Sequence, residues 1–225
     1  PNGAFHQDGT TTLSANMTNV STTPIQVAST ASFPSSGWLL IDSEIISYTT
    51  KTATTFDGTV TRGVLGSTNV AHTSGAQVSE VRGTGSPTTL GVVKFNNTDY
   101  SNGVSIGASD ITQVVFTQPG YYNVQFSAQL LSFANAADNV TIWMLKNGTD
   151  IAESAGIITC PGSHGGVAGA TVAGWNFFVQ LAANDYIELY WTTDGGNSVL
   201  LSYPPGVSPV HPVSPAVIFT ANQIA

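Results

Sequence analysis

The sequence predicts an all-β protein, and three observations support this fold class. Apolar residues recur at every second position through most of the chain, as they do in strands that bury one face. β-Branched and aromatic side chains are frequent, and they favour strands over helices. Turn-forming pairs such as Pro119-Gly120 and Asn147-Gly148 separate the alternating segments. No segment combines a helical period with helix caps.

The alternation is clearest at 122–130, where five apolar side chains interleave with Asn123, Gln125, Ser127 and Gln129. A strand with this pattern has one buried and one solvated face. Further strands are expected in the same part of the chain, at 140–146, 175–181, 187–192, 199–203 and 216–220. Several strands at such spacing predict a β-sandwich or jelly roll at 91–225.

The first part of the chain has shorter alternating pieces, with strands expected at 25–27, 38–41, 45–49 and 75–81. These pieces predict a small separate β module at 13–85. A Gly-, Ser- and Thr-rich stretch then predicts a linker at 86–90. Residues 1–12 are too polar to fold alone, so we expect an extended arm that becomes ordered only against a neighbour.

Charge and hydropathy exclude two classes of partner. The formal net charge is −8, and the only cations are Lys51, Arg62, Arg82, Lys94 and Lys146, so no basic stripe is available for nucleic acid. No apolar run approaches the ~20 residues that cross a bilayer, and the first twelve residues do not resemble a secretory signal. Neither a nucleic acid nor a membrane is an expected partner.

Groups that could carry chemistry are few. The lone Cys160 excludes an intrachain disulfide and is expected to be a small buried hydrophobe. Ser163 and His164 are adjacent in a Gly-rich loop, which does not by itself give the geometry of a nucleophile, its base and an orienting group. The segment 194–197 is expected to form a hairpin turn rather than a calcium loop. The sequence therefore predicts no enzyme, no cofactor and no metal.

Four motifs in the second part of the chain share their order and spacing with one superfamily. They are the strand GYYNVQFS at 120–127, the hairpin LKNG at 145–148, the strand pair LAANDYIEL at 181–189 and the closing strand AVIF at 216–219. Together they resemble the jelly rolls of the complement-globular-head and tumour-necrosis-factor superfamily, in the form that phage structural proteins carry. The proline-rich segment 204–215, ahead of the closing strand, is longer than this resemblance implies.

The first part resembles a small β module that recurs in tailed-phage structural proteins. The motifs that carry this resemblance are FPSSGWLLIDSEIISY at 33–48, TRGVLGS at 61–67 and AHTSGAQV at 71–78. Within them, Arg62 is expected to bond loop carbonyls or Glu44, because guanidinium forks suit such partners. His72 is expected to cap a loop rather than to bind a metal.

The resemblance implies a homotrimer whose jelly rolls bury apolar faces around a three-fold axis. The four tryptophans lie in expected strands, which favours core or interface packing over a carbohydrate-stacking platform. The residues expected at the trimer interface are Tyr122, Phe126, Trp143, Trp175 and Phe177.

Two functions are compatible with such a trimer on the surface of a virion. The first is a non-enzymatic capsid decoration (cement) protein on the phage head, whose arm contacts the major capsid protein through Phe5 and Leu13. The alternative is a tail-fibre or knob adhesin that binds a host surface glycan, although the chain has no long repetitive shaft. A virion-bound glycan hydrolase is the least favoured class. Fold alone does not choose among them.

Overall fold

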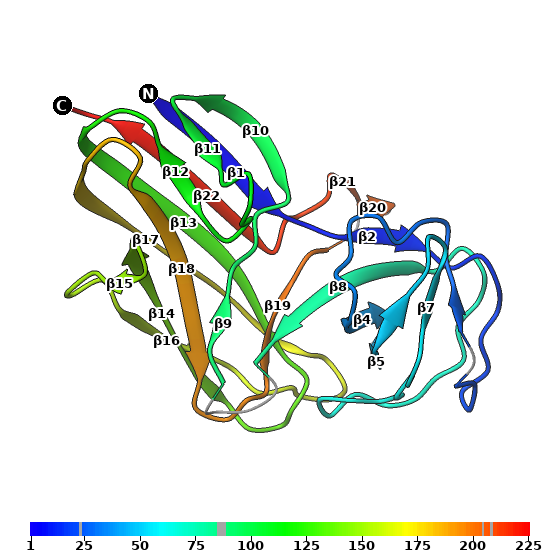
Figure 1. The fold of residues 1–225 in the computed structure, drawn as a ribbon. Helices are drawn as coiled ribbons and strands as arrows, with labels where there is room; N and C mark the ends of the chain where they lie inside the picture. Colours follow the sequence, from blue (N-terminus) through cyan, green and yellow to red (C-terminus); the bar gives the residue numbers. More distant parts are fainter. Residues whose placement is uncertain (23, 85–88, 204, 208) are drawn as a thin grey trace.

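The computed structural model describes residues 1–22, 24–84, 89–203, 205–207 and 209–225 (Figure 1). Every regular element in this part of the chain is a β-strand, and all of these strands are arranged in antiparallel sheets. The predicted all-β class and the jelly-roll-like architecture are therefore confirmed. A helix long and apolar enough to span a membrane does not occur among these residues.

The larger sheet has ten strands and extends through the whole molecule. Its strands are β1 (Asn2–Gln7), β2 (Thr10–Thr12), β4 (Gly37–Ile41), β5 (Glu44–Tyr48), β8 (Gln77–Gly83), β10 (Asn97–Asn102), β13 (Gly120–Ser132), β17 (Gly169–Leu181), β19 (Ser198–Leu201) and β22 (Val217–Gln223). They follow the order β10-β1-β22-β13-β19-β8-β4-β5, with β17 paired to β13 and β2 paired to β8.

A seven-stranded sheet faces the jelly-roll part of the larger one. It consists of β9 (Gly91–Val92), β11 (Val104–Ile106), β12 (Val114–Phe116), β14 (Asp138–Lys146), β15 (Thr149–Asp150), β16 (Gly156–Cys160) and β18 (Tyr186–Thr193). Two small sheets complete the fold. One contains β3 (Ile25–Gln26), β6 (Thr50–Lys51) and β7 (Thr55–Asp57), and the other is the hairpin of β20 (Gly206–Val207) and β21 (Val210–His211).

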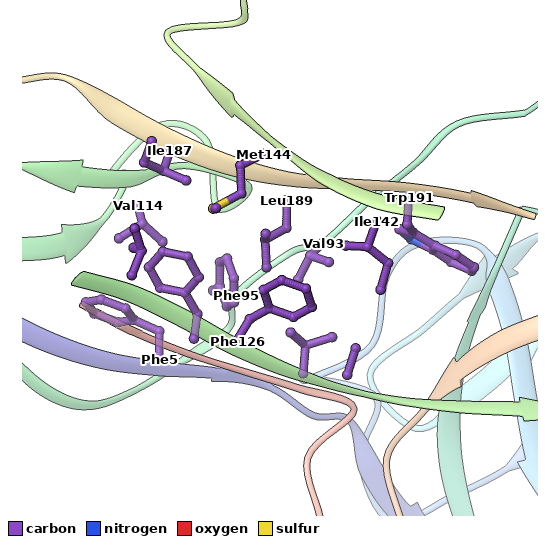
Figure 2. Close-up of a cluster of buried hydrophobic side chains, with 14 of the residues drawn as sticks. Phe5, Val93, Phe95, Val114, Phe126, Ile142, Met144, Ile187, Leu189 and Trp191 are labelled. Atoms are coloured by element: carbon purple, nitrogen blue, oxygen red, sulfur yellow. The ribbon is translucent and has the colours of Figure 1, made fainter. Parts of the chain in front are cut away.

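The main core lies between the two large sheets. On β13 the five alternate apolar residues from Tyr122 to Leu130 are all buried, as the sequence predicts for one face of this strand. Figure 2 shows part of this core, with Phe5 at one end and Trp191 of β18 at the other. Burial of such large side chains is the main favourable contribution to the stability of a globular domain.

A second core belongs to the first part of the chain. Its buried residues run from Leu13 to Val78 and include Phe56, whose ring contacts Phe33 and Tyr48 at centroid distances of 4.9 Å and 4.6 Å. A smaller cluster that includes Val81 and Leu131 lies between the two cores. The boundary between module and jelly roll stays a prediction, because one sheet continues through both and residues 85–88 of the expected linker lie outside the described residues.

The structure differs from the expected N-terminal arm. Asn2–Gln7 forms β1, which pairs with β10 and β22 inside the larger sheet, and Thr10–Thr12 pairs with β8. Phe5 is fully buried in the main core and Leu13 is 2% exposed in the second core, so neither side chain is free for the expected capsid contact. The physical reason is strand pairing within the chain, which satisfies the polar backbone of this segment without a partner.

Candidate assembly surface and buried polar network

The outward face of three neighbouring strands carries no charged side chain. We call this face the uncharged face; all of its residues lie in the described part of β13, β17 and β22. They are Tyr121, Asn123, Gln125, Ser127, Gln129, Ala170, Val172, Gly174, Asn176, Phe178, Gln180, Ile218, Thr220 and Asn222. The strand register places them in rows across the sheet, because Asn123 pairs with both Phe178 and Asn222.

Large apolar side chains stand on the uncharged face. Phe178 is 66% exposed, Val172 59%, Tyr121 48% and Ile218 38%. Between them the backbone at Gly174 is uncovered, and a hollow of about 350 Å³ lies over it. Scattered apolar residues are normal on a surface, but a grouping of them without charge is typical of the central part of an interface.

Two of the five expected interface residues lie inside the chain instead. Tyr122 is fully buried and donates its hydroxyl to the carbonyl of Gln118 at 2.8 Å. Phe126 is 6% exposed, and its ring packs edge-on against Trp175 at a centroid distance of 4.9 Å. Both residues occupy the alternate positions of β13 whose side chains point into the core. They therefore cannot contact a partner on the outward face of the sheet.

The other three expected residues are half-buried and do not form one group. Trp175 and Phe177 lie on the inward face of β17 and pack against the main core. Trp143 lies on β14 in the opposite sheet, where its Nε1 donates to Asp150 at 2.8 Å. The exposed residues of β17 are those at the alternate positions, whose side chains point outward. The sequence feature that could have predicted this face is the run of uncharged residues at those positions.

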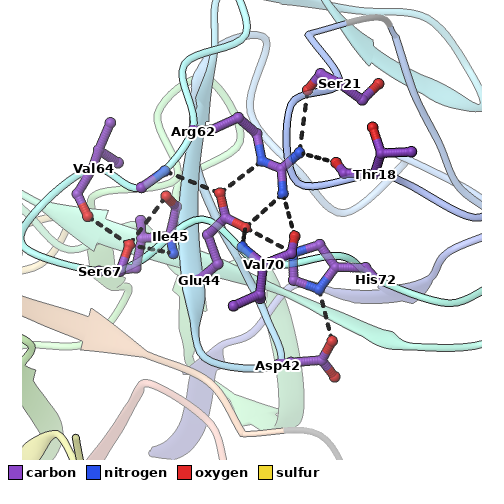
Figure 3. A network of polar contacts seen from close by, with 11 residues as sticks. Thr18, Ser21, Asp42, Glu44, Ile45, Arg62, Val64, Ser67, Val70 and His72 are labelled. Carbon is purple, nitrogen blue, oxygen red and sulfur yellow. Dashed lines mark hydrogen bonds and ion pairs between the residues drawn. The ribbon is translucent and has the colours of Figure 1, made fainter.

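The densest polar cluster lies in the first part of the chain, around Glu44 (Figure 3). Arg62 donates to both Glu44 oxygens, from Nε and Nη2, at 2.6 Å each. Its remaining hydrogens reach the carbonyls of Thr18, Ser21 and Val70. The expectation that Arg62 bonds Glu44 and loop carbonyls is confirmed, and the fork geometry of a guanidinium explains why this residue type is needed.

His72 joins the same cluster. Its Nε2 lies 2.9 Å from Glu44 Oε2 and its Nδ1 lies 2.7 Å from Asp42 Oδ2. The backbone of His72 also pairs with Met17, so this residue connects the loop at Met17 to the cluster. The sequence predicted a loop cap, and the role of the ring between two carboxylates was missed.

Glu44 is fully buried yet stays ionised. Burial alone would raise its pKa, but hydrogen bonds from Arg62, the Val70 N–H and His72 outweigh that effect and hold the pKa below its usual value. Glu44 and His72 are 0% and 2% exposed, so substrate has no access to them. The cluster can therefore tie loops together but cannot act on a substrate as it stands.

The Ser163–His164 segment does not form a catalytic arrangement. The Ser163 hydroxyl bonds Asn135 Oδ1 at 3.0 Å, and His164 pairs with Val167 through its backbone. Cys160 is fully buried, as expected, and burial raises the pKa of its thiol. Within the described residues, no group of three or more His, Cys, Asp or Glu side chains is arranged to hold a metal ion.

The segment 194–197 is a turn, but it does not close a hairpin. It connects β18 in the smaller sheet to β19 in the larger one. The buried carboxylate of Asp138 accepts hydrogen bonds from the N–H groups of Gly195, Asn197 and Ser198 at 2.6–3.0 Å. These three hydrogen bonds satisfy the buried carboxylate and fix the turn, so its conformation does not require a bound ion.

No known protein-family model matches the chain, and no curated protein matches it in sequence. The functional argument therefore rests on the residues and their arrangement.

Proposed function

We propose that the protein is a non-enzymatic structural subunit that acts as a homotrimer on the surface of a phage virion, as a decoration protein of the head. The major capsid protein is its proposed partner. The observation that carries self-association is the uncharged face of β13, β17 and β22, with Phe178 and Val172 exposed on β17. The placement on a phage particle is supported by the motifs at 120–127 and 33–48.

The physical argument concerns the cost of removing a surface from water. Charged groups are expensive to desolvate, whereas amide and hydroxyl groups can exchange water for partners at small cost. Apolar groups gain about 25 cal/mol for each Å² that they bury. A face with exposed Phe and Val and no charge is therefore suited to permanent burial against copies of itself.

The corrected N-terminus changes which part would contact the capsid. Since Phe5 and Leu13 are core residues, the first module would dock through its exposed loops rather than through an arm. Val20, for example, is 77% exposed in the loop that follows Met17. Self-association through the uncharged face leaves these loops free, because the first module lies around β4, β5 and β7, away from β13, β17 and β22 (Figure 1).

The oligomeric state is tested by light scattering on the purified chain. The wild type should have three times the 23.3 kDa chain mass. Phe178→Glu should give a folded monomer, because it places three charges in the buried interface of a trimer. Val210→Glu is the matched control, since Val210 is 86% exposed on the β20–β21 hairpin and off the uncharged face. A monomeric wild type, or equal effects of the two variants, would contradict the trimer.

The location is tested by adding purified protein to phage heads that lack it. A decoration protein should co-sediment with heads and raise the temperature at which they release DNA. The adhesin alternative gives the opposite pattern, in which the protein leaves heads unchanged, binds host cells and blocks infection. That pattern would replace the decoration proposal by receptor binding.

A further inference from the structure

A cleft of about 460 Å³ lies where loops of the first module meet loops of the jelly roll. The module side is the segment 31–35 before β4, and the jelly-roll side includes Asn96, Asn97 and Ile111. Arg82, at the end of β8, and Lys94 also line it. Its volume falls within the roughly 300–1,000 Å³ of small-molecule sites. We call it the Arg82 cleft.

The Arg82 cleft contains two of the five cations of a chain whose net charge is −8. Lys94 has no carboxylate within 4 Å of its ammonium in the described part of the chain, and Arg82 Nε has no hydrogen-bond partner there. Arg82 Nη2 lies 2.6 Å from Glu80 Oε1, and the Arg82 side chain is 20% exposed. The positive charge of the cleft is thus only partly neutralised.

Two carboxylates lie near these cations, and one of them, Asp8, lines the cleft. Its Oδ1 accepts from Asn97 Nδ2 at 2.7 Å and its Oδ2 lies 3.4 Å from His6 Nε2. Glu80 is 2% exposed and forms an ion pair with Arg82, although neither of its oxygens has a well-directed hydrogen bond from the described residues. The lining residues thus carry two positive charges, Arg82 and Lys94, against the one negative charge of Asp8.

We propose that the Arg82 cleft binds an acidic saccharide, whose carboxylate is held by Arg82 and Lys94. Arg82 and Lys94 line one cleft, and a guanidinium and an ammonium both favour a carboxylate, which accepts charge-assisted hydrogen bonds. The other lining groups select a sugar: Ser32 and Ser35 supply hydroxyls, and Pro34 with the 43% exposed Ile111 supplies an apolar wall for ring C–H groups. Polar groups that orient a ligand beside an apolar wall are usual in such sites.

Binding should strengthen as the pH falls through neutrality. Burial raises the pKa of Glu80 to about 7, against the opposing effects of Arg82, Lys94 and Lys51 and with a small further rise from Asp8. Tyr48 also faces Glu80, but it is neutral in this range because burial raises its pKa. Protonation of Glu80 removes the negative charge beside Arg82, which leaves the guanidinium freer to bind an anion.

The test is an NMR titration of the isotope-labelled full chain with D-glucuronate and, as the matched neutral sugar, D-glucose. Glucuronate should give saturable shifts confined to residues of the Arg82 cleft, and glucose should give none. Arg82→Gln and Lys94→Gln should each weaken binding by about tenfold, the loss expected for one charge-assisted contact. Lys146→Gln removes the same charge outside the cleft and should change the affinity less than twofold.

Three results would overturn the proposal. They are equal weakening by Lys146→Gln, which would show general charge attraction; acetate binding as tightly as glucuronate, which would show a plain anion site; and no saturable shift with glucuronate. Glu80→Gln should bind glucuronate with the same affinity at pH 6 and pH 8, whereas the wild type should bind more weakly at pH 8. None of these outcomes depends on the trimer, so failure here and failure of the proposed function are separate results.

Discussion

The two cores of this protein are stabilised in different ways. Among the described residues the main core has roughly twice as many buried hydrophobic side chains as the core of the first module. The module has short strands and irregular loops, and it adds the buried cluster of Glu44, Arg62 and His72. Small cores bury too little surface to hold long loops by apolar contact alone.

The cluster shows what replaces apolar contact in the module. It joins the loop at Thr18, the start of β5 at Glu44, and the segment from Arg62 to His72, which are far apart in the sequence. Small domains often use disulfides or metal ions to cross-link loops in this way. Here a charged cluster with satisfied hydrogen bonds does so, and its removal should affect the module before the jelly roll.

The largest expected effect comes from deleting residues 1–12. The deletion removes β1, which pairs with β10 and β22, and removes Phe5 from the main core. It also removes β2 from β8, so both parts of the molecule lose a strand. We expect loss of cooperative thermal unfolding, measured by calorimetry. Deleting Pro1 alone, which keeps β1, is the control. A folded, stable deletion variant would restore the expectation of an extended arm that becomes ordered only against a neighbour.

A smaller effect, confined to the module, is expected for Arg62→Ala. Removing one partner of a buried ion pair leaves Glu44 uncompensated and costs about 3–5 kcal/mol. Hydrogen exchange should show faster opening of β4 and β5 than of β13 and β14. Lys146→Ala is the matched control: its ion pair with Asp185 is partly exposed and should contribute less than about 1 kcal/mol. Equal loss of protection in both cores would show that they unfold as one unit.

The smallest expected effect is a pH dependence at the junction. Burial raises the pKa of Glu80 from 4.5 to about 7, so the folded state binds more protons than the unfolded state between these values. This contribution to stability is present below pH 4.5 and is lost as the pH rises through 7. The shift corresponds to roughly 3 kcal/mol.

The measurement is the free energy of unfolding in urea at several pH values from 5 to 8. Glu80→Gln should lose the decline that the wild type shows over this range, because the amide cannot ionise. The lowered pKa values of Glu44 and Asp185 act in the opposite direction but below this range. A wild type whose stability rises from pH 5 to 8 would show that Glu80 is better solvated than its 2% exposure indicates.

Strands with a regular apolar period could be predicted from the sequence. The strand expected at 122–130 is β13, and the one expected at 187–192 is β18, each found slightly longer. The period reveals them because one face is buried, which is a local property of the sequence. The partners of Arg62 could also be predicted from the sequence. A guanidinium in a region with few other cations needs hydrogen-bond acceptors, and Glu44 and loop carbonyls lie in the same part of the chain.

The first strand could not be predicted in this way. In β1 the inward residues are Gly3, Phe5 and Gln7, and only one of them is a large hydrophobe. Gly3 is needed because a Cβ there would lie 2.6 Å from the ring of Phe5, and the buried Gln7 accepts a bond from Ser202 through its carbonyl. These are properties of tertiary contacts. The inward or outward direction of Tyr122 and Phe178 likewise depends on which face of the sheet is covered.

Because the larger sheet continues through both parts of the molecule, it fixes the orientation of the module relative to the jelly roll. β8 pairs with β4 of the module and with β19 of the jelly roll, and Val81 has a partner in both. The module is therefore held at a fixed angle by backbone hydrogen bonds rather than by a tether. In the proposed trimer, three modules would keep a constant spacing. All three modules could then bind at once only to a lattice whose repeat matches that spacing. The rigid sheet would therefore restrict the trimer to surfaces with the right spacing of binding sites, in addition to the right contacts.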